Sequence, residues 1–295
     1  MSRTSFASVV ILFAGSVLAR AQSMPDADMH HDHGAPAAMT MISSDSNLPA
    51  GATDVAARLA ASPRHREWVL IPAGNGDTVG AWVIYPERKT KAPVVVVIHE
   101  IFGLSTWIKG VGDQLAADGF IAVVPDLVGK PMPGGPDSVS VDDARKVIAM
   151  LKPEDTQRRI IAAANYGMRL PAATQKYGVV GFCWGGGTAF LQAAFGPDVS
   201  ASVVYYGVSP DSTVIGKVHA PVLGLYGGDD ARVDVTIDPA DAALRARKVT
   251  YDHFLFDGAG HGFLRDQGGR DGANLAATRA AWPKTIAWFR LYLEK

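Results

Sequence analysis

Cys183 is the only cysteine of this 295-residue chain, and it lies in a segment crowded with glycine. The glycines around it are Gly181, Gly185, Gly186 and Gly187. A lone cysteine is most often a small buried hydrophobic residue. Glycines, however, allow a tight turn in which neighbouring backbone comes close and the residue at the tip is held in a strained conformation. This frame favours a reactive thiol, which as thiolate can attack an acyl carbon and form a covalent intermediate.

The residues on either side of Cys183 predict a strand followed by a helix. Residues 177–182 form a short apolar run rich in valine, typical of a buried strand, and residues 188–195 form an apolar run of helical character. We expect a glycine turn between them. The spacing Gly181-x-Cys183-x-Gly185 is that of a nucleophile elbow, with cysteine where serine is usual.

A nucleophile of this kind needs an acid and a base, and two later glycine-rich loops offer them in that order. Asp229 and Asp230 follow two glycines, and His261 lies between glycines further along the chain. We expect His261 to be the general base. The residues alone do not separate the two aspartates: one would orient the imidazole of His261, and the other would cap the next turn.

The negative oxygen that develops during acyl transfer needs backbone N–H donors. By the usual geometry of an elbow, these donors are the amides of Trp184, at the helix start, and of Ile101, after the first parallel strand. The helix N-terminus is expected to lower the pKa of the Cys183 thiol, whereas a carboxylate at Glu100, on the same rim, would oppose ionisation. The alternative for Glu100 is a rim acid paired with a basic side chain.

Strands and helices that alternate along the chain must position these groups. Residues 93–98, Pro-Val-Val-Val-Val-Ile, are typical of a central parallel strand buried on both faces. The alternation predicts an α/β fold with a doubly wound, mostly parallel sheet and helices on both faces. Further strands are predicted at 67–71, 78–85, 120–124, 200–206, 222–226 and 249–255, and helices at 53–61, 106–118, 141–151, 153–168, 239–247 and 275–293. The loop at 128–137 would lie over the carboxyl ends of the strands, where such sheets bind ligands.

The N-terminus has the pattern of a secretory signal peptide. Arg3 precedes an apolar run at 5–18, and Ala19-Arg20-Ala21 provides the small residues that a signal peptidase reads. Residues 1–21 are therefore predicted to be removed, and the protein is predicted to be exported, periplasmic or secreted. The apolar run is too short for a membrane span, so we expect no stable membrane association.

We predict a flexible linker with a short helix at 22–62 and the α/β domain at 63–295. His30, His31 and His33 lie in the linker beside aspartates. A histidine-rich tract can bind a transition metal, although a solvated polar tail is the more frequent interpretation.

Composition excludes several classes of function. The net charge of −1 gives no electrostatic basis for binding nucleic acid or an anionic membrane. We found no ligand spacing of the zinc type, and we predict neither a cofactor nor a metal at the site. A single cysteine cannot form an internal disulfide, and the sequence does not indicate an oligomeric state.

Five ordered motifs carry a resemblance to a known family. They are HEIFGL (99–104), PDL (125–127), GFCWGG (181–186), GGDD (227–230) and GAGHGF (258–263). In these motifs the chain resembles the dienelactone hydrolases, also called carboxymethylenebutenolidases. The resemblance extends over residues 67–295 and implies an α/β-hydrolase fold and the hydrolysis of small esters or lactones.

The resemblance also implies roles for individual residues. It assigns the family's triad to Cys183, Asp230 and His261, which decides between the two aspartates, and it assigns to Glu100 the glutamate that holds the resting thiol neutral. Arg265 matches an arginine that binds the substrate carboxylate. At a second such arginine this chain has Lys130, which keeps the charge but lacks the bidentate fork. Lys130 puts dienelactone itself in question, and a small ester or lactone remains the expected substrate.

Three functional hypotheses follow. The first is an exported cysteine-dependent hydrolase of small esters or lactones, which Arg265 and Lys130 would make selective for carboxylate-bearing ones. The second is a thioesterase or peptidase that uses the same triad. The third is a non-enzymatic metal-binding or buffering protein that uses the histidine tract. We further hypothesise that Glu100 protects Cys183 from oxidation until substrate arrives.

Overall fold

The computed structural model describes residues 45–129 and 140–295. The predicted signal peptide, the tract of His30, His31 and His33, and Lys130 lie outside the described residues, so the interpretations that rest on them stay predictions. The boundary predicted between linker and α/β domain at residue 62 also stays a prediction.

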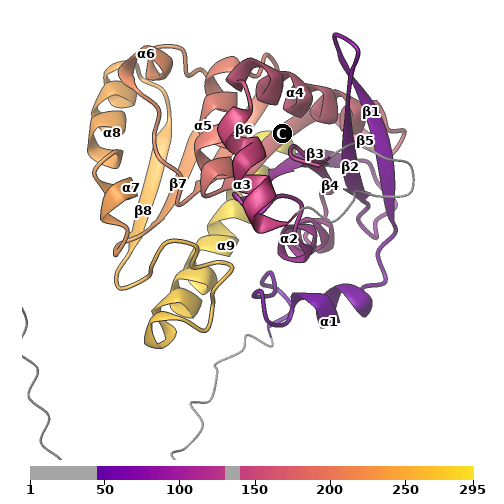
Figure 1. Ribbon diagram of the computed structural model, residues 1–295, viewed down its shortest axis with the longest axis horizontal. Coiled ribbons are helices and arrows are strands. Elements are labelled where there is room, and N and C mark those ends of the chain that lie inside the picture. Colours follow the sequence, from indigo (N-terminus) through magenta and orange to yellow (C-terminus); the bar gives the residue numbers. More distant parts are fainter. Residues whose placement is uncertain (1–44, 130–139) are drawn as a thin grey trace, which may run out of the picture. The chain divides into compact units, whose positions relative to one another are not determined.

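Eight strands of the described residues form one sheet in the order β1-β2-β4-β3-β5-β6-β7-β8 (Figure 1). The strands are β1 (Arg66–Gly74), β2 (Asp77–Ile84), β3 (Ala92–Ile98), β4 (Ile121–Asp126), β5 (Ala173–Phe182), β6 (Val199–Tyr205), β7 (Val222–Gly227) and β8 (Tyr251–Phe256). Only the pairs β1–β2 and β2–β4 are antiparallel, and every later pair in this order is parallel. The predicted doubly wound, mostly parallel sheet is confirmed.

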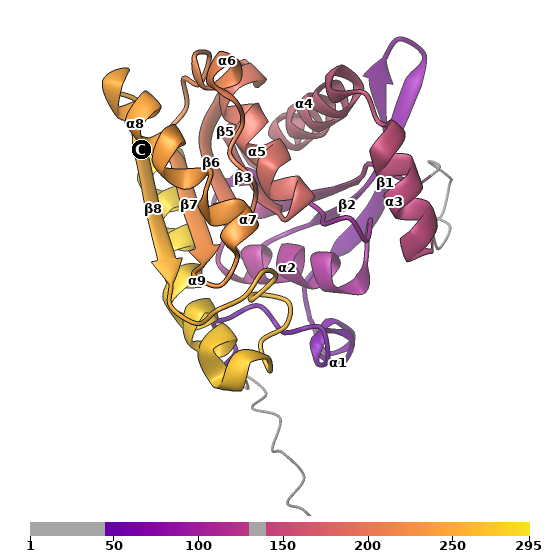
Figure 2. The ribbon, with the colours of Figure 1, turned by 60° about the vertical axis from the view of Figure 1, so that its left-hand side comes forward.

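Helices cover both faces of the sheet (Figure 2). The helices are α1 (Val55–Ala60), α2 (Thr106–Ala117), α3 (Val141–Met150), α4 (Pro153–Arg169), α5 (Trp184–Phe195), α6 (Ser212–Ile215), α7 (Ala231–Asp234), α8 (Ile237–Ala246) and α9 (Ala273–Leu293), with a short 3₁₀ helix at Arg270–Gly272. Side chains of α4, α5 and α8 pack into the core on one face, and those of α2 and α9 pack into the core on the other.

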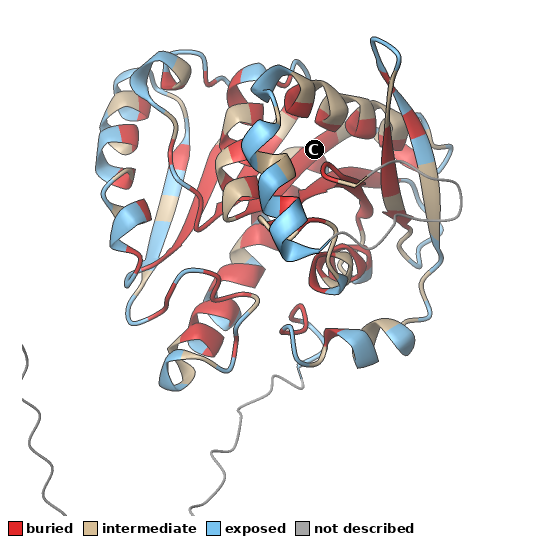
Figure 3. Ribbon diagram, viewed as in Figure 1, coloured by how far each residue is buried: buried red, intermediate tan, exposed pale blue. Residues whose placement is uncertain are grey.

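The strand β3 shows why this chain folds around a parallel sheet. Val94 and Val96 point into one core and Val95 and Val97 into the other, and all four are fully buried. Because successive side chains of a strand alternate between faces, a continuous run of valine has no polar face and must be covered on both sides. Figure 3 shows the central strands as buried, whereas the edge strands β1 and β8 are partly exposed.

The predicted boundaries differ from the structure at the central turn. The helix α5 begins at Trp184, as the elbow geometry predicts, and not at residue 188, where the apolar run begins, so Gly185 belongs to the helix and not to a glycine turn. A Cβ atom on Gly185 would collide with the carbonyl oxygens of Ile98 and His99, and one on Gly181 would collide with the backbone of Gly185. The glycines are therefore required because the start of α5 lies directly against β3 and β5.

Candidate active site

Cys183 forms the whole of the turn between β5 and α5. Its backbone has φ of 57° and ψ of −118°, a left-handed conformation that costs a non-glycine residue about 1–3 kcal/mol. The surrounding backbone maintains it: the N–H of Cys183 donates to the carbonyl of Tyr205 at 3.1 Å, and the carbonyl of Cys183 accepts from the N–H of Gly186 at 2.9 Å. This geometry places the thiol at the carboxyl edge of the sheet, as a nucleophile elbow does.

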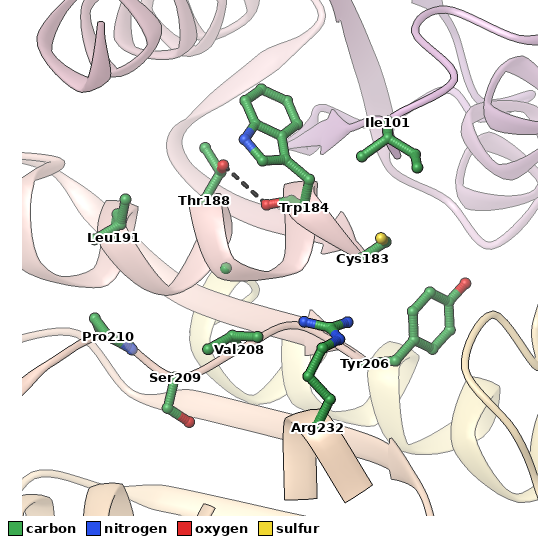
Figure 4. A pocket seen from close by; sticks show the side chains of 11 residues that line it. Ile101, Cys183, Trp184, Thr188, Leu191, Tyr206, Val208, Ser209, Pro210 and Arg232 are labelled. Atoms are coloured by element: carbon green, nitrogen blue, oxygen red, sulfur yellow. Dashed lines mark hydrogen bonds between the residues drawn. The ribbon is translucent and has the colours of Figure 1, made fainter. Parts of the chain in front are cut away.

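The thiol lines a cavity of about 570 Å³ (Figure 4), a size typical of small-molecule sites. The wall of the cavity is largely apolar, with Ile101, Trp184, Leu191, Val208 and Pro210. Tyr206, Ser209 and Arg232 are among its polar lining residues. The two predicted oxyanion donors, Ile101 and Trp184, thus lie beside the cavity together with Cys183.

The surroundings of Cys183 favour a neutral thiol. Burial raises the pKa of the Cys183 thiol above its ordinary value, and the nearby carboxylate of Glu100 raises it further. The backbone N–H groups of Trp184 and Ile101, which donate to the sulfur, lower the pKa of the thiol. The amide of Trp184, at the start of α5, lowers the thiol pKa as predicted, but desolvation outweighs it, so the net pKa of Cys183 is raised.

Glu100 is buried at the end of β3, with 3% of its surface exposed. Burial raises the pKa of Glu100 to about 7, even though Arg265 acts to lower it. The Nε of Arg265 donates to Oε2 of Glu100 at 2.9 Å, and the guanidinium lies 5.0 Å from the ring centre of Phe102. Glu100 therefore both pairs with a basic side chain and acts on the thiol. Arg265 is held by Glu100 and is not among the residues that line the cavity.

His261 and Asp230 form a hydrogen-bonded pair. Nδ1 of His261 donates to Oδ2 of Asp230 at 2.5 Å, which leaves Nε2 of the imidazole available. Asp230 follows β7 and is buried, whereas His261 follows β8 and has a side chain that is 33% exposed. The prediction that the other aspartate caps the next turn is wrong, because the carboxylate of Asp229 instead accepts from Arg270 at 2.7 Å and α7 has no side-chain cap.

Tyr206 lines the cavity with Cys183 and also packs against His261. No hydrogen bond joins the Cys183 sulfur to His261 in the part of the chain that the structure describes. Tyr206 lines the cavity beside Cys183, and its ring packs edge-on against His261 with centroids 5.1 Å apart. Its hydroxyl is buried and has no hydrogen-bond partner among the described residues. The sequence analysis missed Tyr206, although its place just after β6 puts it on the same sheet edge as Cys183.

His99 joins three of the sequence motifs into one structure. Its Nδ1 donates to the carbonyl of Glu100 at 2.7 Å, and its Nε2 accepts from the N–H of Leu127 at 3.2 Å. Its ring also stacks on Trp184, with centroids 5.6 Å apart. Burial lowers the pKa of His99, which keeps the ring neutral and lets Nε2 accept. His99 therefore fixes the loop that carries Glu100 and Ile101.

The loop that carries His261 is held from two sides. Asn274, in α9, accepts from the N–H of Gly260 at 3.0 Å and donates to the carbonyl of Asp266 at 2.7 Å. From the other side, Gln267 donates to the carbonyl of Pro49 at 2.8 Å. Side chains of α9 and the segment before α1 thus restrict the position of the imidazole.

Arg232 is the one charged residue among the described lining residues, and the sequence analysis missed it. It lies in α7, two positions after Asp230, and this short spacing is the signal that could have found it.

Among residues 45–129 and 140–295, no cluster of three or more histidine, cysteine, aspartate or glutamate side chains is arranged to hold a metal ion. No helix in these same ranges combines the length and apolar character that a membrane span requires.

Comparisons with known proteins place this chain in a family. The model of the dienelactone hydrolase family matches residues 79–293. A Salmonella typhimurium protein named as a carboxymethylenebutenolidase is 29% identical over 266 residues, covering 83% of this chain and 96% of that protein. A protein of the same name from Methylorubrum extorquens is 31% identical over 240 residues, covering 76% of this chain and 80% of that protein.

Solved structures agree with the sequence comparisons. A Klebsiella pneumoniae protein named as a dienelactone hydrolase has a TM-score of 0.68 and 27% identity, covering 78% of this chain and 99% of that chain. An acylaminoacyl peptidase from Pyrococcus horikoshii has a TM-score of 0.62 at 18% identity, covering 82% of this chain and 44% of that chain. At that identity the second similarity shows the shared fold alone.

Proposed function

The chain belongs to the dienelactone hydrolase family and is therefore a hydrolase, and we propose that it cleaves small esters or lactones with Cys183 as its nucleophile. The observation that carries the proposal is the left-handed turn at Cys183, which presents the thiol to a largely apolar cavity next to the amides of Ile101 and Trp184. A cysteine with only a packing role has no need of a strained turn at a cavity wall.

In the proposed reaction, the sulfur of Cys183 attacks the acyl carbon and the ester C–O bond breaks. The thiol proton passes to His261 and from there to the leaving oxygen, and Asp230 stabilises the imidazolium that forms between these steps. Water, deprotonated by His261, then attacks the thioester and releases the acid and the thiol. Because the resting sulfur interacts with Glu100 and has no hydrogen bond to His261, the thiol must turn toward the imidazole before it loses its proton.

The two backbone amides support the same proposal. In the resting protein the N–H groups of Trp184 and Ile101 donate to the sulfur of Cys183 itself. When the sulfur bonds to a carbonyl carbon, the oxygen on that carbon lies near the sulfur, where the same two N–H groups can donate to it and stabilise its negative charge. Removal of one such donor typically costs about 10²-fold to 10³-fold in kcat.

The test of this function is a substrate panel with direct detection of the intermediate. We expect the protein to hydrolyse short p-nitrophenyl esters and unsaturated lactones, and rapid quenching followed by peptide mass spectrometry to find the acyl group on Cys183. A panel without turnover, or an acyl group on another residue, would contradict the proposal. Equal or faster turnover of thioesters or peptides would favour the second functional hypothesis instead.

We expect Glu100→Gln to make Cys183 easier to alkylate. The Glu100 carboxylate raises the pKa of the Cys183 thiol, so its removal increases the fraction of thiolate at a given pH. Because the pKa of Glu100 is about 7, its charge acts mainly above that pH. The rate of iodoacetamide reaction should rise at least about threefold at pH 8 and much less at pH 6.

The matched control is Glu294→Gln, which removes a carboxylate that does not line the cavity. Its alkylation profile should follow that of the wild type. If Glu100→Gln reacts at the wild-type rate throughout this pH range, Glu100 does not protect the thiol.

A further inference from the structure

The cavity beside Cys183 has a single charged side chain among its described lining residues, that of Arg232. The helix α7 begins directly after Asp230, so the loop that provides the acid also places Arg232 at the cavity wall. Figure 4 shows the guanidinium pointing into the cavity, across from the turn that carries Cys183. Arg232 is solvent-exposed, so its charge lies at the open side of the cavity.

The guanidinium of Arg232 has no partner among the described residues. Within the described ranges it makes no ion pair, hydrogen bond or ring contact. Two other arginines of the candidate site already form ion pairs: Arg265 pairs with Glu100 at 2.9 Å, and Arg270 pairs with Asp229 at 2.7 Å. A guanidinium offers five N–H donors in a planar fork that matches a carboxylate. A negatively charged ligand that enters this cavity would therefore find Arg232 free to bind it.

The charge of Arg232 also acts on the reacting atom. Burial and Glu100 raise the pKa of the Cys183 thiol, and Arg232 is among the groups that lower it. Charge acts over longer distances beside a low-dielectric wall than in bulk water. Because Arg232 and Cys183 line the same cavity, one ligand can place an anionic group at Arg232 and its scissile carbonyl at Cys183.

We propose that Arg232 binds a carboxylate of the substrate and so determines which esters or lactones the cavity accepts. The inference rests on the proposed function, because it assigns a specificity to that same site. It differs from the assignment that the sequence resemblance implies. Arg265, which that resemblance gives to the substrate carboxylate, is bound to Glu100 and is not a lining residue of the cavity.

The test compares two esters that differ by one terminal carboxylate, mono-p-nitrophenyl glutarate, which carries it, and p-nitrophenyl butyrate, which does not. The measured quantity is the ratio of kcat/KM for the glutarate ester to kcat/KM for the butyrate ester. We expect Arg232→Gln to lower this ratio at least about tenfold, mainly through KM of the glutarate ester, because a charge-assisted hydrogen bond is lost. Arg232→Lys should retain part of the ratio, since it keeps the charge without the fork.

The matched control is Arg245→Gln, which removes the same charge from α8, where Arg245 is exposed and pairs with Asp241 at 2.8 Å. Its ratio should equal that of the wild type. A ratio for Arg232→Gln within twofold of the wild type would overturn the inference while leaving the proposed function intact. A wild-type protein that hydrolyses neither ester would instead overturn the proposed function, and this inference with it.

Discussion

Cys183→Ala is expected to lower kcat for ester hydrolysis by about 10⁴-fold or more, because the substitution removes the sulfur that forms the covalent acyl intermediate. Removing the nucleophile of such a triad leaves only binding and the oxyanion donors, which provide a small residual rate. The measurement is kcat with a short p-nitrophenyl ester that the wild type hydrolyses.

The fold should survive this substitution. Alanine has the same Cβ as cysteine, so the left-handed turn with φ of 57° is no more strained than before. The thiol also has no hydrogen bond to His261 that could be lost. Thermal unfolding within a few degrees of the wild type would establish that the loss is chemical. Turnover of Cys183→Ala at the wild-type rate would disprove the assignment of the nucleophile.

Asp230→Asn is expected to lower kcat by about 10³-fold to 10⁴-fold, the loss seen when the acid of a triad becomes an amide. In the structure Asp230 accepts a hydrogen bond from Nδ1 of His261 at 2.5 Å. An amide group can instead donate to Nδ1, which would place the imidazole proton on Nε2, where the base must accept one. The amide also cannot stabilise the imidazolium by charge.

The neighbouring residue provides a control that few sites offer. Asp229→Asn makes the same chemical change one position earlier, but Asp229 pairs with Arg270 at the surface, where both side chains are about half exposed. Ion pairs of this kind contribute about 0–1 kcal/mol. We expect kcat of Asp229→Asn within about twofold of the wild type. Equal losses in the two variants would show that the pairing of Asp230 with His261 is not what matters.

Much of this fold was readable from local patterns in the chain. The run of valines in β3, the glycines around Cys183 and the alternation of strands and helices predicted a mostly parallel sheet with an elbow at its centre. Strands that run parallel bring their carboxyl ends to one edge, so residues after different strands could be expected to meet. Asp230 and His261, which follow β7 and β8, do meet in this way.

The apolar run at 188–195 marks only the later part of α5, for a physical reason. Three glycines in a row are poor helix formers, and a local reading therefore places them in a turn. In the folded protein all three belong to the helix, and Gly185 and Gly186 must be glycine because a Cβ atom there would collide with the backbone of β3 and β6. Tertiary packing here overrides the local preference.

Spacing along the chain predicts which edge a residue occupies, but it does not predict burial or the partner of a charge. Glu100 and Arg265 are 165 positions apart, and their contact engages the arginine that the motif alone assigned to substrate. Among the described residues, Arg232 has no partner, whereas the carboxylates of Asp230 and Asp229 pair with His261 and Arg270. The thiol pKa of Cys183 rises because several elements exclude water from it. Desolvation and ion pairing depend on three-dimensional proximity, so the neutral resting thiol and the proposed selectivity of the site arise only in the tertiary structure. The order of the reactive groups along the chain is already determined by the sequence.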